Sequence, residues 1–240
     1  MGIAPDGSPI DLYAEGLPEL GEAELVHDAA GAGASILELG CGAGRVTRGL
    51  VRLGHGVVAV DESSEMLERL SGLTGVEAVC ATIQDLRLDR VFDVVLLASN
   101  LINTAENDRR AAMLRTCRRH VADSGCVIIE RMDPRWAEPA WAADKVAQPG
   151  HIGAVTVTSH GLLVDPPFMT ETTEFTLPDG RSWRQGPFTS LILDDDALEI
   201  ELRIADLCLE RWVSWQGTER IWCTARPVGL THTPAAEVAP

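Results

Sequence analysis

The stretch ILELGCGAGRVTRGL, residues 36–50, constrains the fold more than any other part of the chain. A short apolar run leads into three closely spaced glycines and then into a segment with helical apolar spacing. This order is typical of a strand, a tight turn and a helix in a parallel α/β sheet. Glycines let the backbone of such a turn approach a ligand, and the helix N-terminus favours negative charge. The stretch therefore predicts a site for a nucleotide-like cofactor.

The first half of the chain alternates between strand-like and helix-like segments. Strands that alternate with helices form a parallel sheet with right-handed crossovers, so the sequence predicts an α/β fold. The predicted helices cover residues 22–34, 44–54, 63–73 and 108–121, and the predicted strands cover 35–40, 56–61, 76–83, 92–99 and 125–132.

The alternation stops between residues 133 and 185, which contain no clear helix. Residues 154–160 and 170–177 alternate in the period of a strand, and the Asp-Gly turn of residues 177–181 is of a hairpin type. The sequence therefore predicts an antiparallel β insertion over 133–185, after the fifth strand.

The last fifth of the chain again contains helix-like and strand-like segments. Residues 194–207 predict a helix with an acidic first turn. Residues 208–226 predict two strands around a Gln216-Gly217 turn, and 229–240 a disordered tail. No repeat or linker divides the chain, so residues 1–240 are expected to form one domain.

Composition limits the classes of partner. The 240 residues carry a formal net charge of −16, which argues against binding nucleic acid or an anionic membrane surface. The N-terminus lacks the apolar core of a signal peptide, and no run has transmembrane length. The six cysteines show no spacing typical of a metal site. We therefore expect a cytoplasmic protein with no metal, acting on a small molecule.

The spacing of the glycines bears on the cofactor. Gly40, Gly42 and Gly44 form G-x-G-x-G, and Arg45 stands where a dinucleotide turn would have its third glycine. Glu38 also places an acid inside the first strand. This is a poor turn for a pyrophosphate, which disfavours a nicotinamide-dependent oxidoreductase without excluding it.

Asp61 ends the second predicted strand, in VVAVDESSEML. A carboxylate at this position can accept hydrogen bonds from both hydroxyls of a ribose. Met66, a few residues later, is suited to pack against a flat purine. The alternative for Asp61 is a helix-capping role.

Together, LELGCGAGRVT and VVAVDESSEML resemble the class I methyltransferases that use S-adenosylmethionine. The resemblance covers roughly residues 22–226 and is greatest to small bacterial enzymes that act on small molecules and natural products. It implies a Rossmann-like, doubly wound, seven-stranded sheet whose last strand pair is antiparallel. It also implies an acceptor site built by the insertion.

The resemblance assigns cofactor roles one residue at a time. Glu38, Gly40 and Gly42 would hold the methionine end, Gly44 would close the loop, and Asp61 would bind the ribose. The segment that would line the adenine departs from the family at Thr82, where family members often have an aspartate. The full set of predicted cofactor residues is Glu38, Gly40, Cys41, Gly42, Gly44, Asp61, Glu62, Met66, Thr82, Ile83, Ala98 and Ser99.

Two residues are candidates for a general base. Glu130 ends the fifth predicted strand, where a buried carboxylate can have a raised pKa; the alternative is an ion pair with an arginine such as Arg131 or Arg135. His160 lies in the insertion, and its alternative is an exposed or structurally bonded histidine.

Five further residues are candidates for the acceptor site. The tryptophans could stack on a flat acceptor or simply pack the insertion. The asparagines could instead satisfy loop backbone, and the tyrosine could lie in a lid or in a frayed terminus. These residues are Tyr13, Asn100, Asn103, Trp136 and Trp183.

The function predicted from these residues is methyl transfer from S-adenosylmethionine to a small, aromatic or apolar metabolite by direct in-line displacement. The alternative is a module that binds the cofactor or its demethylated product without catalysis. Trp212, Trp215 and Trp222, in the last strand pair, are expected in the core or in the interface of a homodimer.

Overall fold

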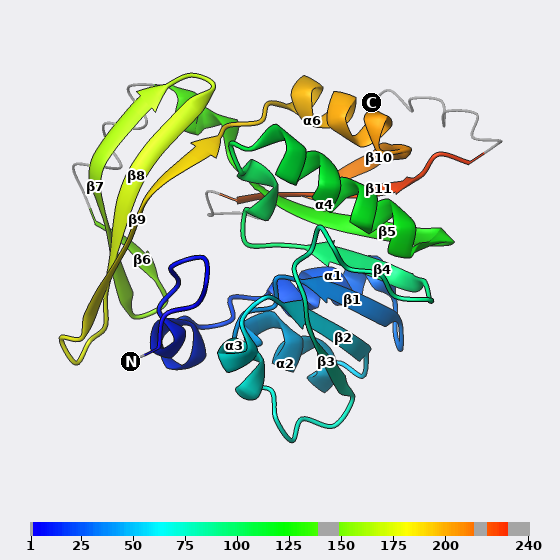
Figure 1. Cartoon of the computed structure of the whole chain (residues 1–240), viewed down its shortest axis with the longest axis horizontal. Helices are drawn as coiled ribbons and strands as arrows, with labels where there is room; N and C mark the ends of the chain where they lie inside the picture. The colour runs from blue at the N-terminus through cyan, green and yellow to red at the C-terminus, as the bar shows by residue number, and fades with distance from the viewer. Residues whose placement is uncertain (1, 139–148, 214–219, 230–240) are drawn as a thin grey trace, which may run out of the picture.

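Two sheets dominate the computed structural model, which describes residues 2–138, 149–213 and 220–229 (Figure 1). The larger sheet has seven strands in the order β10-β11-β5-β4-β1-β2-β3, and β11 alone runs against the others. The predicted seven-stranded α/β sheet with an antiparallel last pair is thus confirmed. Its strands are β1 (Ser35–Leu39), β2 (Gly56–Asp61), β3 (Val76–Cys80), β4 (Phe92–Leu97), β5 (Val121–Met132), β10 (Leu207–Val213) and β11 (Arg220–Pro227).

Helices cover both faces of this sheet because the side chains of each strand alternate between them. Ile36 of β1 packs in a cluster with Val26 and Leu50, whereas its neighbour Leu37 packs with Leu114 and residues of the last helix on the opposite face. The helices are α1 (Glu22–Ala30), α2 (Arg45–Arg52), α3 (Ser64–Glu68), α4 (Asn107–His120) and α6 (Asp195–Ile204).

Shorter helical turns complete the chain. The helix predicted over 63–73 is shorter than expected, since after Glu68 the chain continues in turns up to the left-handed Gly72 (φ 82°). The turns with helical geometry are a π-helix η1 (Leu12–Gly16) and two 3-10 helices, η2 (Leu101–Asn103) and η3 (Pro134–Ala137).

The predicted insertion forms the second sheet, which is entirely antiparallel. It extends beyond the expected boundary at residue 185, because the pairing of its last two strands continues to Phe168 and Leu191. The expected hairpin turn closes with a hydrogen bond from Leu177 N to Arg181 O. The strands, in sheet order, are β6 (Gly150–Ile152), β7 (Val155–Asp165), β8 (Phe168–Thr176) and β9 (Ser182–Leu191).

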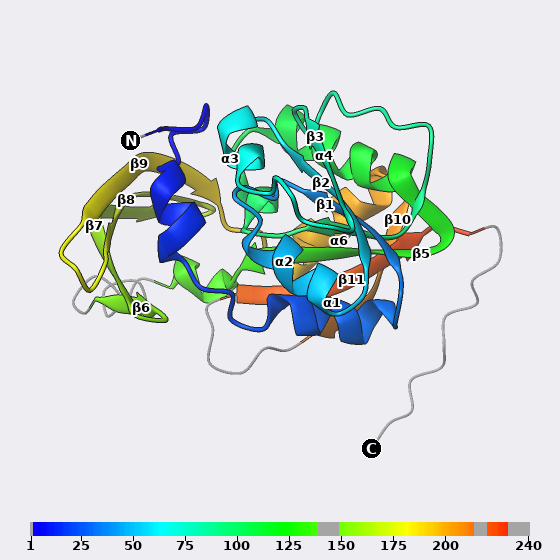
Figure 2. The same ribbon diagram turned by 90° about the horizontal axis from the view of Figure 1, so that it is seen from below.

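The N-terminal segment packs between the two sheets, as Figures 1 and 2 both show. Leu12 is fully buried in a cluster with Phe175 and Trp183 of the insertion. Ile10 packs with Met66 beside the glycine loop. The segment is therefore packed, which excludes the frayed alternative for Tyr13.

Other expectations concern the cysteines and the chain ends. Four cysteines are buried, as expected for core residues, but Cys80 is exposed and Cys208 is half-buried. Among the described residues, no helix is long and apolar enough to cross a membrane. The Gln216-Gly217 turn and residues 230–240 of the predicted tail lie outside the described part of the chain.

Candidate functional site

A cavity of about 560 Å³ opens at the carboxyl ends of β1, β2, β4 and β5. The N-terminal segment and the insertion sheet form its other walls. Ligands of open α/β sheets bind at this edge. Every predicted cofactor residue except Gly44 lines the cavity, and so do Tyr13, Asn100 and Glu130 from the predicted acceptor and catalytic sets.

The glycine loop takes a backbone conformation that other residues rarely adopt. Gly40, Gly42 and Gly44 have φ angles of 69°, 54° and 82°. A Cβ built on Gly42 would meet only one described atom within 4 Å, Cδ1 of Tyr13 at 4.0 Å, so this position opens into the cavity. A Cβ on Gly44 would overlap the side chain of Leu70, so this glycine instead permits close packing at the start of α2.

Asp61 holds the loop from the end of β2. Its Oδ2 accepts a hydrogen bond from Gly42 N at 2.8 Å, and its Oδ1 accepts one from Ser63 N at 2.9 Å. Burial raises the pKa of this carboxyl, although both backbone donors oppose the shift. Each oxygen keeps a further lone pair, so the carboxylate can still accept from a ligand in the cavity.

Glu38 is a second buried carboxyl beside the loop, with 4% of its surface exposed. Burial raises its pKa to about 7, against the effect of Thr47, whose Oγ1 donates to Glu38 Oε2 at 2.6 Å. The negative charge of Asp61 also raises the pKa. Glu38 is therefore a cavity-lining group that can change charge near neutral pH.

The hydroxyl of Thr82, at the predicted adenine end, donates to the Asp85 carboxylate at 2.8 Å. The carbonyl of Ile83 accepts from Thr116 Oγ1 at 2.9 Å. Gln84 lines the cavity as well, and sequence reasoning did not select it. A side-chain amide here offers both a donor and an acceptor.

Glu130 is fully buried at the end of β5. Its Oε2 accepts from Ser99 N at 2.7 Å, and its Oε1 lies 3.1 Å from the guanidinium of Arg220. Burial raises the pKa of Glu130, while Arg220 opposes the shift. The expectation of an ion pair was right, but the proposed partners were wrong: Arg131 contacts Asp195, and Arg135 contacts Asp133.

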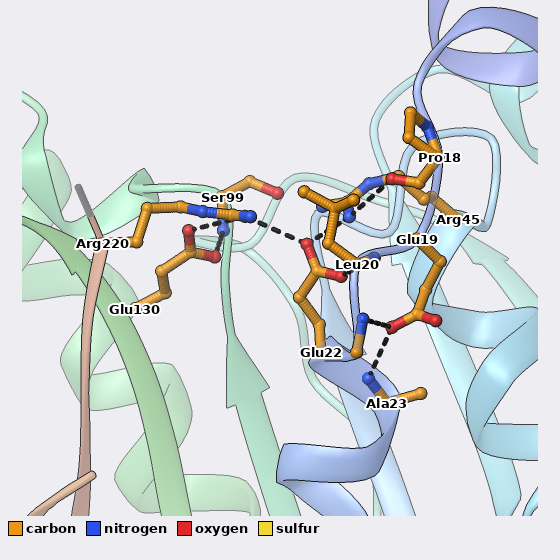
Figure 3. A network of polar contacts seen from close by, with 10 residues as sticks. Pro18, Glu19, Leu20, Glu22, Ala23, Arg45, Ser99, Glu130 and Arg220 are labelled. Atoms are coloured by element: carbon orange, nitrogen blue, oxygen red, sulfur yellow. Dashed lines mark hydrogen bonds and ion pairs between the residues drawn. The ribbon is translucent and has the colours of Figure 1, made fainter. Parts of the chain in front are cut away.

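Arg220 is part of a longer chain of charges that sequence reasoning missed (Figure 3). Its guanidinium also lies 3.0 Å from Glu22 of α1. Glu22 in turn pairs with Arg45, the first residue of α2, whose guanidinium also donates to the Pro18 carbonyl at 3.3 Å. Residues this far apart in sequence leave no local pattern from which the pairing could be predicted.

Asn103 of the predicted acceptor set and His160 of the predicted catalytic set do not line the cavity. Asn103 is buried and binds backbone on both sides, donating to Leu191 O at 2.8 Å and accepting from Met132 N at 2.9 Å. His160 Nε2 lies within hydrogen-bond distance of Glu174 Oε2, at 2.8 Å. Asn103 thus satisfies loop backbone and His160 is a structurally bonded histidine, as the alternative interpretations of these two residues had it. The side chain of Trp136 lies outside the described part of the structure.

Trp183 is buried among Leu12, Val155 and Phe175, where it packs the N-terminal segment against the insertion. We expect Trp183→Ala to lower the free energy of unfolding by roughly 3–5 kcal/mol, since it removes a large buried side chain. Denaturant unfolding of the variant and the wild type measures this loss. Unchanged stability with altered acceptor kinetics would contradict this packing role and favour the acceptor wall instead.

Several residues of the acceptor half carry no recognisable sequence signal. They come from the insertion, from α4 and from the end of β5, and they combine an apolar surface with a few charges. They are Arg109, Met132, Ile152, Val157, Glu171 and Phe175, and His151 of the insertion lines the cavity beside them.

Comparison with known proteins agrees with this architecture. A family model described as a methyltransferase domain matches residues 36–125. The cypemycin N-terminal methyltransferase of a Streptomyces species is 37% identical over 132 residues, which are 52% of this chain and 54% of that protein. The chain thus spans about half the length of the curated relative that it matches.

Solved structures match over almost the whole chain. The CcbJ methyltransferase from Streptomyces caelestis superposes with a TM-score of 0.71 at 21% identity, covering 95% of this chain and 99% of that one. The sugar N-methyltransferase KedS8 from Streptoalloteichus sp ATCC 53650 gives 0.67 at 22% identity, covering 94% and 96%. Residues 36–125 thus match the model of a methyltransferase domain, and the chain has the fold of the class I S-adenosylmethionine-dependent methyltransferases.

Proposed function

We propose that the protein transfers a methyl group from S-adenosylmethionine to a small natural-product-like acceptor. The observation that carries this proposal is the single cavity that joins the glycine loop, Asp61 and Glu38 to the insertion wall. The first group of residues is suited to the cofactor, and the insertion wall leaves a separate surface for the acceptor.

The cofactor would lie across the ends of β1, β2 and β4. The methionine end would lie on the glycine loop near Glu38, the ribose diol on Asp61, and the adenine near Thr82 and Ile83. Its ammonium group would favour the ionised form of Glu38. The sulfonium would then face Ser99 and the acceptor half of the cavity.

The acceptor wall favours a molecule with an apolar or aromatic body. Met132, Ile152, Val157 and Phe175 contribute apolar surface to the cavity, and Tyr13 adds a ring with a polar end. One relative is named as an N-terminal methyltransferase, and one structural neighbour is named as a sugar N-methyltransferase. We therefore infer an amine nitrogen as the site of methylation.

The chemical step would be an in-line displacement. Bound S-adenosylmethionine would supply an electrophilic methyl group: the acceptor nitrogen would take the methyl carbon as the carbon–sulfur bond breaks, and the pair of electrons of that bond would leave on the sulfur of S-adenosylhomocysteine. The nitrogen then carries an extra proton, which Glu130 could accept as its carboxylate. Holding nitrogen and methyl in a near-attack geometry can supply roughly 7–11 kcal/mol, so positioning would be the protein's main contribution.

The proposal is tested with S-adenosylmethionine carrying an isotopically labelled methyl group. The protein is incubated with a metabolite extract and with the probe alanyl-phenylalanine amide, and mass spectrometry follows both the label and S-adenosylhomocysteine. Label in an amine-containing product is the expected result. Tight binding of S-adenosylhomocysteine with no labelled product from any acceptor would favour the non-catalytic module instead.

The pH dependence of cofactor binding is a further expected result. Burial raises the pKa of Glu38 to about 7, so at lower pH the free protein carries a proton on this carboxyl. The ammonium of the cofactor would bind the ionised carboxylate, so this proton must be released when the cofactor binds. We expect S-adenosylhomocysteine binding to weaken about tenfold per pH unit below this pKa, with release of one proton. Calorimetry in buffers of different ionisation enthalpy measures both. The Glu38→Gln variant should bind more weakly and without this pH dependence.

Three expectations about the protein's surroundings remain predictions. They are a cytoplasmic location, the absence of a nucleic-acid partner and a possible homodimer.

Trp222 is fully buried in the core beneath α1, so it does not contribute to an interface, whereas Trp212 packs beside Arg131 at the edge of the sheet.

A further inference from the structure

Arg220 occupies a position between the two halves of the cavity. It begins β11, opposite Met132 of β5, and its side chain lines the cavity with 21% of its surface exposed. One guanidinium nitrogen lies 3.1 Å from Glu130 and 3.0 Å from Glu22, both of which are fully buried carboxylates. Arg220 therefore contacts the candidate base directly without belonging to the surfaces predicted for cofactor or acceptor.

The contacts of Glu22 fix the geometry of this arrangement. Its other cationic partner, Arg45, directly follows the glycine loop, so the chain of charges runs from the start of α2 across α1 to β5 (Figure 3). The charged groups that face Glu130 are Arg220 from β11, Arg45 from α2 and, across Arg220, Glu22 from α1. Ser99 N, at the end of β4, donates to the remaining oxygen of Glu130.

We propose that Arg220 is a positioning residue that keeps the Glu130 carboxylate ionised and oriented toward the acceptor. The proposal rests on the proposed function, in which Glu130 takes the proton of the methylated nitrogen. A buried carboxylate that loses its cationic partner becomes protonated rather than remaining charged. A protonated Glu130 could not accept a proton, so the reaction would then require a higher pH.

Glu22 restricts Arg220 to one orientation. A guanidinium loses less conformational entropy for each hydrogen bond that it forms, because its planar group of donors is already aligned. Lysine keeps the charge but has a single ammonium on a flexible stem. The Arg220→Lys variant should therefore retain most of the electrostatic effect, while Arg220→Gln should lose it.

The first experiment measures the protonation of Glu130 without any ligand. Infrared difference spectra between each protein and its Glu130→Gln counterpart report the protonated carboxyl band across a pH series. We expect Arg220→Gln to move the midpoint up by at least about one pH unit and Arg220→Lys to move it less. Arg226→Gln is the matched control: it removes another arginine of β11 that pairs with Glu210, and it should leave the midpoint unchanged.

The second experiment measures kcat against pH for the transfer to alanyl-phenylalanine amide. In Arg220→Gln the acid limb of the profile should move to higher pH by the shift seen in the infrared titration, with the KM for S-adenosylmethionine little changed. The ionisation of the probe's amine is common to all variants and cancels in the comparison. A Glu130 midpoint that does not move in Arg220→Gln, or moves equally in Arg226→Gln, would overturn the proposal.

Two other results separate this proposal from the proposed function. If the Glu130 midpoint rises but the acid limb stays in place, Arg220 does not act through the base and the positioning role is wrong. If no methyl transfer to any acceptor is found, the proposed function fails, whereas the infrared titration still decides whether Arg220 sets the charge of Glu130.

Discussion

Asp61→Ala is expected to weaken S-adenosylhomocysteine binding by at least about 100-fold while the protein remains folded. The carboxylate would accept from two ribose hydroxyls, and hydrogen bonds to a charged group contribute roughly 1.5–3 kcal/mol each. A loss of about 3 kcal/mol corresponds to about two decades in Kd. The variant also removes the acceptor that holds Gly42 N and Ser63 N, so the loop itself becomes less ordered.

Calorimetry on Asp61→Ala measures the change in Kd, and circular dichroism measures the fold. Glu77→Ala is the control, because Glu77 is an exposed acid on the neighbouring strand β3 that pairs with Arg90 and does not line the cavity. The control should bind like the wild type. An unchanged Kd in Asp61→Ala would remove this residue from the cofactor site.

Gly42→Val is expected to abolish measurable cofactor binding and to leave a folded protein. The substituent would project into the cavity, where Tyr13 is the one described side chain near it. The positive φ of 54° adds backbone strain of order 1–3 kcal/mol, which a chain of this size can tolerate. The loss of binding would thus come mainly from blocked space.

Gly54→Val is the control that separates backbone strain at a positive φ from blockage of the cofactor cavity by the new side chain. Gly54, at the end of α2, also has a positive φ, 88°, and a Cβ there would have no described atom within 4 Å. It lies outside the cavity lining. Both variants should lose similar stability in thermal unfolding, but only Gly42→Val should lose S-adenosylhomocysteine. Normal binding by Gly42→Val would mean that the glycine loop is a turn without a role in the cofactor site.

The cofactor half of the cavity could be predicted because its signals are local. Apolar runs of strand length, closely spaced glycines and an acid at the end of the next strand lie within about 26 residues, from Ile36 to Asp61. A parallel sheet brings the ends of adjacent strands to the same edge. Sequence order alone therefore places Glu38, the glycine loop and Asp61 together.

The acceptor half could not be predicted in the same way, because it depends on strand register and on distant partners. A shift of one residue in a strand exchanges its two faces, so alternation alone did not reveal that Val157 and Phe175 line the cavity while His160 pairs with Glu174. Likewise, Glu130 and Arg220 become neighbours only when β11 pairs with β5.

The most direct test of the central claim is calorimetric titration of the purified protein with S-adenosylhomocysteine and, in parallel, with NAD⁺. The glycine spacing, the open side of Gly42 and the placement of Glu38 and Asp61 together predict saturable one-to-one binding of S-adenosylhomocysteine and none of NAD⁺. Binding of NAD⁺ without binding of S-adenosylhomocysteine would contradict the claim that this cavity is built for a methyl-donor cofactor.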